Sequence, residues 1–164
     1  MLYASQLLSL AEQLAESPPR GAPKQVRLRR PISTAYYAVV HRLVSGAADI
    51  LVGAGQLRNS QRYLLVYRSF EHRRMADVCR QVMGGSLRTE SGAPFEAAIR
   101  QCAAAFIELQ EGRHEADYDP IIKIALSDAK TAVAKAPTAI QRLENSPEPE
   151  RMLFLTLLHF KFRP

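Results

Sequence analysis

At 164 residues the chain is long enough for one domain with a sizeable hydrophobic core, and we expect residues 1–164 to form that single domain. The two cysteines are far apart in the sequence, which excludes a disulfide framework and a zinc site. The N-terminus lacks a basic leader, which excludes a signal peptide, and no apolar run approaches the roughly 18 residues of a membrane helix. We therefore expect a cytoplasmic protein. The net charge is +6, with 14 basic and five acidic residues between Arg20 and Arg100, which favours an anionic partner such as RNA, although ordinary solvent-exposed helix faces can have the same composition.

Apolar residues recur at helical spacing along most of the chain, and alanine and leucine dominate them. We therefore predict an all-α fold, an up-and-down helical bundle with a four-helix core plus terminal helices. The expected helices span residues 2–16, 24–52, 60–83, 94–118 and 120–143, and a last helix starts at Pro147 with Ser146 as its cap. The segments between them are the break at 17–23, the Gly53-Ala-Gly55 turn and a polar loop at 84–92.

Four helices have features that bear on their shape. In the first helix, an apolar stripe predicts the face that packs inward, formed by Leu7, Leu10 and Leu14 with Tyr3 one turn earlier. In the second, Pro31 predicts either a helix start near Arg30 or a kink. In the later helices we expect a bend near Ser69 and a kink at Pro137.

A polar stripe follows one face of the second helix. Its residues are spaced by four, three and four positions, which places them in line: Arg30, Thr34, Tyr37 and His41. A guanidinium, a hydroxyl, a phenol and an imidazole in a row are candidate ligand-binding groups. Alternatively, Tyr37 and His41 are half-buried core residues whose polar tips are hydrogen-bonded within the fold.

The third helical region is basic, through Arg68, Arg73, Arg74 and Arg80, with Asp77 spaced to pair with Arg73 or Arg80. Such a face binds phosphates or is simply solvated. Further on, Glu111 and His114 form the Glu-x-x-His pattern of di-iron helical bundles. That site needs a second copy of the pattern, which the sequence lacks, so we expect no metal and no other cofactor.

The most informative segment is the corner Leu109-Gln-Glu-Gly-Arg-His-Glu-Ala-Asp-Tyr-Asp-Pro120. Pro120 ends the incoming helix, and Asp119 is expected to cap the next one. Arg113 and Asp117 share a helical face, as do His114 and Tyr118. Arg113 could bind a phosphate while Asp117 fixes the orientation of the Arg113 guanidinium. Alternatively, the two residues could form an ion pair that only stabilises the corner.

Two segments of the sequence resemble a known family. Arg-His-Glu-Ala-Asp-Tyr-Asp-Pro at 113–120 and Leu-Arg-Arg-Pro-Ile-Ser-Thr-Ala-Tyr-Tyr-Ala-Val-Val-His at 28–41 resemble motifs of the prokaryotic HEPN superfamily, and the segment 70–79 is also similar. The resemblance implies an all-helical, usually dimeric protein that binds or cuts RNA in a toxin–antitoxin or defence setting. The implied partners are a second copy of the chain, RNA or a nucleotide, and a cognate antitoxin protein.

The chain departs from the ribonuclease members of that family at one position. They have a histidine four to six residues after the arginine, whereas here residues 118–120 contain Tyr118 and no histidine. A phenol with a pKa near 10 is a poor base at neutral pH. The candidate catalytic residues are therefore Arg113, His114 and Tyr118, with Arg113 stabilising phosphate charge, His114 or His41 moving protons, and no metal.

The expected function is RNA binding with a weak or lost metal-independent ribonuclease activity. The alternatives are a non-catalytic homodimeric interaction module and a bundle that binds a nucleotide or another small anion. The C-terminal tail, residues 152–162, is apolar almost all round. It is expected either to pack across a homodimer interface or to cap the bundle.

Overall fold

A computed structural model describes residues 2–16 and 24–160, and the all-α fold is confirmed there: the described residues contain no strand beyond an isolated bridge between Arg88 and Pro94. The break expected at 17–23 and the last residues of the tail lie outside this part. The described helices are α1 (Leu2–Glu16), α2 (Lys24–Val52), a short 3₁₀ helix η1 (Gly55–Asn59), α3 (Gln61–Arg68), α4 (His72–Met83), α5 (Ala97–Tyr118), α6 (Leu126–Glu144) and α7 (Glu148–Leu157).

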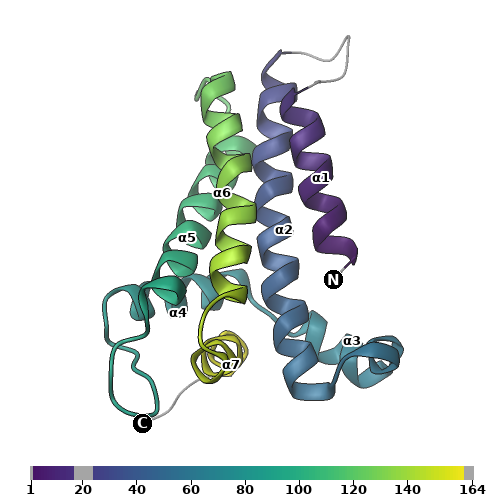
Figure 1. The fold of residues 1–164 in the computed structure, drawn as a ribbon. Coiled ribbons are helices and arrows are strands. Elements are labelled where there is room, and N and C mark those ends of the chain that lie inside the picture. Colours follow the sequence, from purple (N-terminus) through teal and green to yellow (C-terminus); the bar gives the residue numbers. More distant parts are fainter. Residues whose placement is uncertain (1, 17–23, 161–164) are drawn as a thin grey trace.

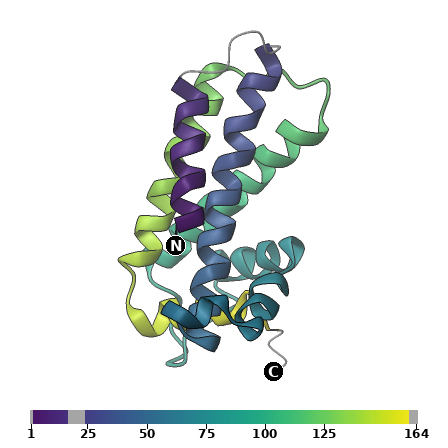
Figure 2. The same cartoon turned by 90° about the vertical axis from the view of Figure 1, so that its right-hand side faces the viewer.

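Helix α2 is the centre of the bundle. Figures 1 and 2 show α1, α2, α5 and α6 side by side, with α3, α4 and α7 at one end, and α2 packs against helices of both groups. Small residues along α2 let its neighbours approach closely: a Cβ added at Gly46 would lie 3.1 Å from Leu155 of α7. Pro31 lies inside the helix and is buried, so α2 does not begin near Arg30.

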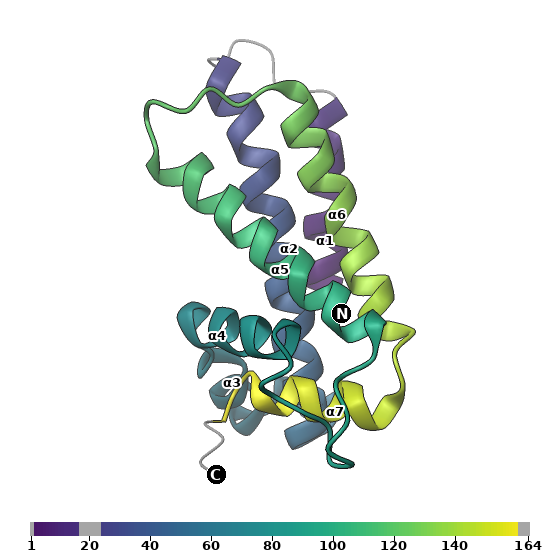
Figure 3. The same ribbon diagram turned by 90° about the vertical axis from the view of Figure 1, so that its left-hand side faces the viewer.

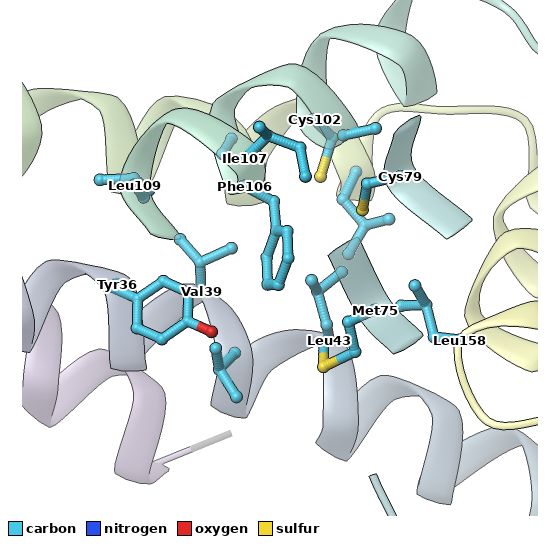
Figure 4. Close-up of a cluster of buried hydrophobic side chains, with 14 of the residues drawn as sticks. Tyr36, Val39, Leu43, Met75, Cys79, Cys102, Phe106, Ile107, Leu109 and Leu158 are labelled. Atoms are coloured by element: carbon cyan, nitrogen blue, oxygen red, sulfur yellow. The ribbon is translucent and has the colours of Figure 1, made fainter. Parts of the chain in front are cut away.

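The core lies where α2, α4, α5 and α7 meet. Figure 4 shows Tyr36 and Leu43 of α2 facing Phe106 of α5, with Met75 of α4 and Leu158 beside them. All five side chains are less than 2% exposed. The two cysteines, Cys79 and Cys102, are buried free thiols in α4 and α5, as expected for small apolar residues.

The inward face of α1 is not the predicted leucine stripe. Leu10 is 44% exposed and Tyr3 is also exposed, while Leu7 and Leu14 are only partly buried. The buried positions of this helix are Ala4, Ala11 and Ala15. Small side chains allow α1 to pack close against α2 and α6, so the alanine face is the one that enters the core.

The corner after α5 is longer than predicted, and we call residues 116–125 the α5–α6 corner. Tyr118 ends α5 as expected, but α6 begins at Leu126 rather than Pro120, so Asp119 does not cap it. Asp119 instead accepts hydrogen bonds from the backbone N–H groups of Ile121 (2.8 Å) and Ile122 (3.2 Å). The proline fixes an extended residue before it, and the isoleucines that follow disfavour a helix.

Other boundaries also differ from the prediction. The expected helix 60–83 is two helices, α3 and α4, separated at residues 69–71, and α5 starts at Ala97 rather than Pro94. Ser146 does not cap α7; it is buried, and its hydroxyl donates to the carbonyl of Leu143 at 2.6 Å. Helix α7 buries Phe154, Leu155 and Leu157 against the bundle, so the tail caps the bundle within the chain.

Candidate functional site

Arg113, on the last turns of α5, is held on three sides. Its Nε lies 2.8 Å from Asp117 Oδ2, an ion-pair contact that lacks hydrogen-bond geometry. Its Nη2 donates to the hydroxyls of Tyr37 (3.0 Å) and Tyr118 (3.2 Å). The remaining nitrogen, Nη1, makes no hydrogen bond with any described residue, and the side chain is 21% exposed. The guanidinium is therefore neither sealed in the interior nor fully engaged.

Three tyrosine rings surround this guanidinium, and we call them the aromatic collar. The Cζ atom of Arg113 lies 6.0 Å from the ring centroid of Tyr36, 5.6 Å from that of Tyr37 and 5.0 Å from that of Tyr118. Burial disfavours the charge of Arg113, but the phenols and Asp117 outweigh this effect and raise its pKa. The collar thus favours a fixed positive charge at this point of the surface.

The carboxylate of Asp117 is held from α2 as well as from α5. Ser33, which is 6% exposed, directs its hydroxyl to Asp117 Oδ1 (3.0 Å) and Oδ2 (2.9 Å). The predicted pair of Arg113 and Asp117 is therefore part of a contact between two helices. Sequence reasoning missed Ser33, although it lies one turn before Tyr37 on the same face of α2.

The clamp of the α5–α6 corner is Arg29, which the sequence did not single out. Its Nη1 donates to the carbonyls of Ala116 (2.9 Å) and Asp119 (2.7 Å), and its Nη2 donates to the carbonyl of Ile122 (2.5 Å). Carbonyls at a helix C-terminus lack partners within the helix, and a cation there is favourable. The corner is thus braced without the Arg113–Asp117 pair.

The predicted stripe on α2 divides into residues with different surroundings. Tyr37 reaches Arg113, as described above. Thr34 donates to the carbonyl of Arg30 in its own helix (2.9 Å), and the side chain of Arg30 is exposed and makes no hydrogen bond or ion pair with a described residue. His41 Nδ1 is 2.5 Å from the hydroxyl of Tyr67, so this imidazole pairs with α3.

A groove lies between α4 and α5, beside the collar, and Figure 3 shows α4 running below α5. This α4–α5 groove has a volume of about 380 Å³. It is lined by Tyr36, His72, Arg80, Gln110, Glu111, Arg113, His114 and Glu115. It therefore brings together two of the predicted catalytic residues, Arg113 and His114, while His41 does not line it.

His72 brings a second imidazole into the α4–α5 groove, in addition to that of His114. Its Nδ1 shares a hydrogen bond with the hydroxyl of Tyr36 at 2.7 Å, and its carbonyl accepts from Gln110 Nε2 at 3.2 Å. Burial lowers the pKa of His72, and the positive charge of Arg113 lowers it further. The neutral form of this imidazole is therefore favoured. It lies on a different helix from Arg113, so spacing along the sequence could not reveal it.

His114 and Tyr118 form the exposed side of the site. Their ring centroids are 5.2 Å apart and their planes are inclined by 51°, and Tyr118 is 61% exposed. Tyr118 does not line the groove itself, but it is hydrogen-bonded to Arg113, which does. The phenol is thus placed to orient the guanidinium and to meet solvent.

Ring contacts extend from the collar across four helices. Tyr37 lies 6.4 Å from His41, which in turn lies 4.7 Å from Tyr3 and 5.8 Å from Tyr67. Tyr67 stacks on Tyr63 at 6.1 Å, and Tyr36 is 5.3 Å from Tyr37. With Tyr118 joined through Arg113, this network includes all six tyrosines of the chain.

Within residues 2–16 and 24–160 there is no group of three or more side chains arranged to hold a metal ion, so Glu111 and His114 have no companion ligands there. None of the described helices combines the length and apolar character needed to cross a membrane. Comparisons with known protein families, with curated proteins and with solved structures find no match to this chain. The HEPN resemblance stays a prediction.

Proposed function

We propose that the protein is HEPN-like and binds RNA at the α4–α5 groove, with Arg113 as the phosphate contact. One observation supports this most: Nη1 of Arg113 is free of hydrogen bonds to described residues, while the rest of the guanidinium is held by Asp117, Tyr37 and Tyr118. A positioned cation with an available donor suits a phosphate oxygen, because little ordering remains to be done on binding.

Other groups around Arg113 support a polar, anionic ligand. His114 and Gln110 line the same groove and supply N–H donors. Arg30 on α2 and Arg73 on α4 are exposed, and the stretch that contains both is the basic part of the chain. Such charge attracts a polyanion before specific contacts form.

The proposal is binding rather than cleavage. Metal-independent cleavage of RNA needs a base at the ribose 2′-hydroxyl and an acid at the leaving oxygen, in addition to a cation. His72 already has its Nδ1 paired with Tyr36, and His41 lies outside the groove, which leaves His114 for only one of these two roles. Any ribonuclease activity is therefore proposed to be weak or lost.

The proposed biological setting follows from the resemblance alone. A HEPN-like protein of this kind works as a homodimer in a toxin–antitoxin or defence system, with a cognate antitoxin protein as its partner. Because the apolar tail is already buried within the chain, the dimer interface is proposed to lie elsewhere on the surface.

A second candidate is the binding of a mononucleotide or another small anion. The groove volume of about 380 Å³ is in the range of small-molecule sites. Glu111 and Glu115 also line it, and two carboxylates disfavour a continuous phosphate backbone more than a single phosphate. A competition experiment distinguishes RNA binding from mononucleotide binding. A mononucleotide displaces labelled RNA from the protein only if it occupies the same groove with comparable affinity.

The test is fluorescence anisotropy of a short single-stranded RNA, titrated with protein between about 50 and about 200 mM salt. RNA binding through phosphates predicts that affinity falls steeply with salt. The Arg113→Ala variant is expected to bind about tenfold more weakly and to show a shallower salt slope, because one phosphate contact is lost. The same samples, run on a denaturing gel, report whether the RNA is cut.

Arg142→Ala is the matched control, since Arg142 is exposed on α6 and does not line the α4–α5 groove. It is expected to bind RNA nearly as the wild type does. Equal affinity of the Arg113 and Arg142 variants would remove Arg113 from the site. The absence of RNA binding even at low salt would favour the non-catalytic interaction module. Circular dichroism confirms that each variant is folded.

A further inference from the structure

Tyr118 and His114 present two flat rings to solvent at the mouth of the groove. The residues are four apart on the last turn of α5, and their ring centroids lie 5.2 Å apart. Tyr118 is 61% exposed, and His114 is also exposed. Neither ring belongs to the hydrophobic core. Their exposure is therefore not needed for folding and calls for another role.

The exposed ring of Tyr118 is held in place despite its exposure. Arg113 donates to its hydroxyl at 3.2 Å, and the guanidinium carbon lies 5.0 Å from its ring centroid. The backbone beneath it is fixed by Arg29, which bonds the carbonyls of Ala116 and Asp119 on either side of the residue. A rigid exposed ring loses little conformational entropy when a ligand stacks on it.

The same guanidinium connects this surface to the proposed phosphate contact. Arg113 lines the α4–α5 groove and touches Tyr118, and His114 also lines the groove. A phosphate bound by Arg113 therefore lies near Tyr118, whose ring centroid is 5.0 Å from the guanidinium carbon. In a duplex each base is stacked and paired inside the helix, whereas in a single strand its flat face is open to a side chain.

From these contacts we infer that Tyr118, with His114 beside it, is the stacking surface for an unpaired nucleobase, so that the groove selects single-stranded over double-stranded RNA. This inference rests on the proposed function, because it uses Arg113 as the phosphate contact. It adds single-stranded RNA as the ligand class and Tyr118 as a residue that determines specificity. Stacking on an aromatic ring tolerates every base, so little preference for sequence is expected.

The experiment compares three short probes of equal length: a single-stranded RNA, a ribose-phosphate chain without bases, and a duplex RNA. The wild-type protein is expected to bind the single strand most tightly. The Tyr118→Ala variant is expected to lose about tenfold in affinity for the single strand but clearly less for the base-free chain, because Asp117 and Tyr37 still hold Arg113. Its salt slope stays that of the wild type.

Two control variants separate stacking from other effects. Tyr118→Phe keeps the ring and is expected to retain most of the affinity. Ile121→Ala removes a side chain that is 86% exposed in the same corner and is expected to leave binding unchanged. Equal losses of affinity for the single strand and the base-free chain in Tyr118→Ala would overturn the inference, because Tyr118 would then act by positioning Arg113. Equal wild-type affinity for single strand and duplex would also overturn it.

The failure of this inference is distinguishable from the failure of the proposed function. If binding depends on salt and on Arg113 but is insensitive to Tyr118→Ala, the phosphate contact stands and the stacking surface is refuted. If the wild-type protein binds none of the probes at low salt, both are refuted.

Discussion

At the scale of single residues, the contacts around Arg113 hold its guanidinium in place but leave Nη1 without a hydrogen bond to a described residue. One carboxylate, two hydroxyls and three ring faces hold the guanidinium, and Asp117 is in turn held by Ser33. Each exposed contact of this kind is worth little alone. Together they fix the direction of the free nitrogen, which matters more for binding than the strength of any one contact.

The imidazoles near the site predict how stability depends on pH. Burial lowers the pKa of both His72 and His41, with Arg113 adding to the effect at His72 and His72 adding to it at His41. An unfolded histidine has a pKa near 6.5, so below that pH the unfolded chain binds protons that the folded chain does not. The free energy of unfolding is therefore expected to fall as the pH drops from about 7.5 to about 5.5.

Urea unfolding at several pH values measures this dependence. Replacing both residues by asparagine, which can keep a hydrogen bond to Tyr36 and Tyr67, is expected to flatten the profile. Some dependence remains, because burial also lowers the pKa of His159. An equally steep profile in the double variant would contradict the assignment. Asp49, whose pKa is lowered, changes the free energy of unfolding only at more acidic pH.

Part of the site was predictable from residue spacing, and part was not. Arg113 and Asp117 pair as expected for residues four apart on a helix, and Tyr37 reaches Arg113 from the predicted stripe. His72 and Ser33 were missed because their roles depend on how α4 and α2 are rotated against α5, which no pattern within one helix encodes. The same rotation explains why His41 lies outside the groove.

At the scale of elements, the α5–α6 corner shows how a helix end is kept in place. Pro120 explains why α5 stops, and this much follows from the sequence. The path of residues 119–125 does not follow from the sequence, because contacts from α2 hold this segment in place. Besides Arg29, Gln25 bonds the backbone of Ile124 twice, donating to its carbonyl at 3.1 Å and accepting from its N–H at 2.9 Å.

Removing the clamp is expected to loosen this corner. The variant Arg29→Met keeps most of the aliphatic stem but loses the donors to the backbone carbonyls at this corner, so the free energy of unfolding should fall by about 2 kcal/mol. Hydrogen exchange at the amides of residues 115–125 should accelerate more than elsewhere. The neighbouring Arg30→Met serves as the control, because Arg30 is exposed, and a change under about 0.5 kcal/mol is expected. Equal effects of the two variants would argue against the clamp.

At the scale of the whole molecule, α7 closes the bundle at the end where α3 and α4 lie (Figure 3). The sequence indicated that an apolar tail had to be buried but left open whether this chain or a second copy would bury it. Phe154 is fully buried and lies 6.4 Å, between ring centroids, from Phe95 in the segment before α5. Arg74 of α4 also donates to the carbonyl of Leu157 at 3.2 Å. The tail is thus part of the fold itself.

This closure predicts a large effect from one substitution. Phe154→Ala removes a fully buried ring and is expected to lower the free energy of unfolding by about 3 to 5 kcal/mol. The control is Met152→Ala on the same helix, because Met152 is 43% exposed and should cost less than about 1 kcal/mol. Chemical denaturation followed by circular dichroism compares them. A small effect of Phe154→Ala would show that α7 contributes little to the bundle.

The continuous network of tyrosine rings has a spectroscopic consequence. The chain contains no tryptophan, so its near-ultraviolet emission comes from tyrosine alone. All six emitters lie in one network that ends at Tyr118 on the exposed side of the site. Excitation absorbed anywhere in the network can migrate between neighbouring rings, so quenching at one end is felt by the others. The unlabelled protein thereby includes its own optical reporter of whether that end is occupied.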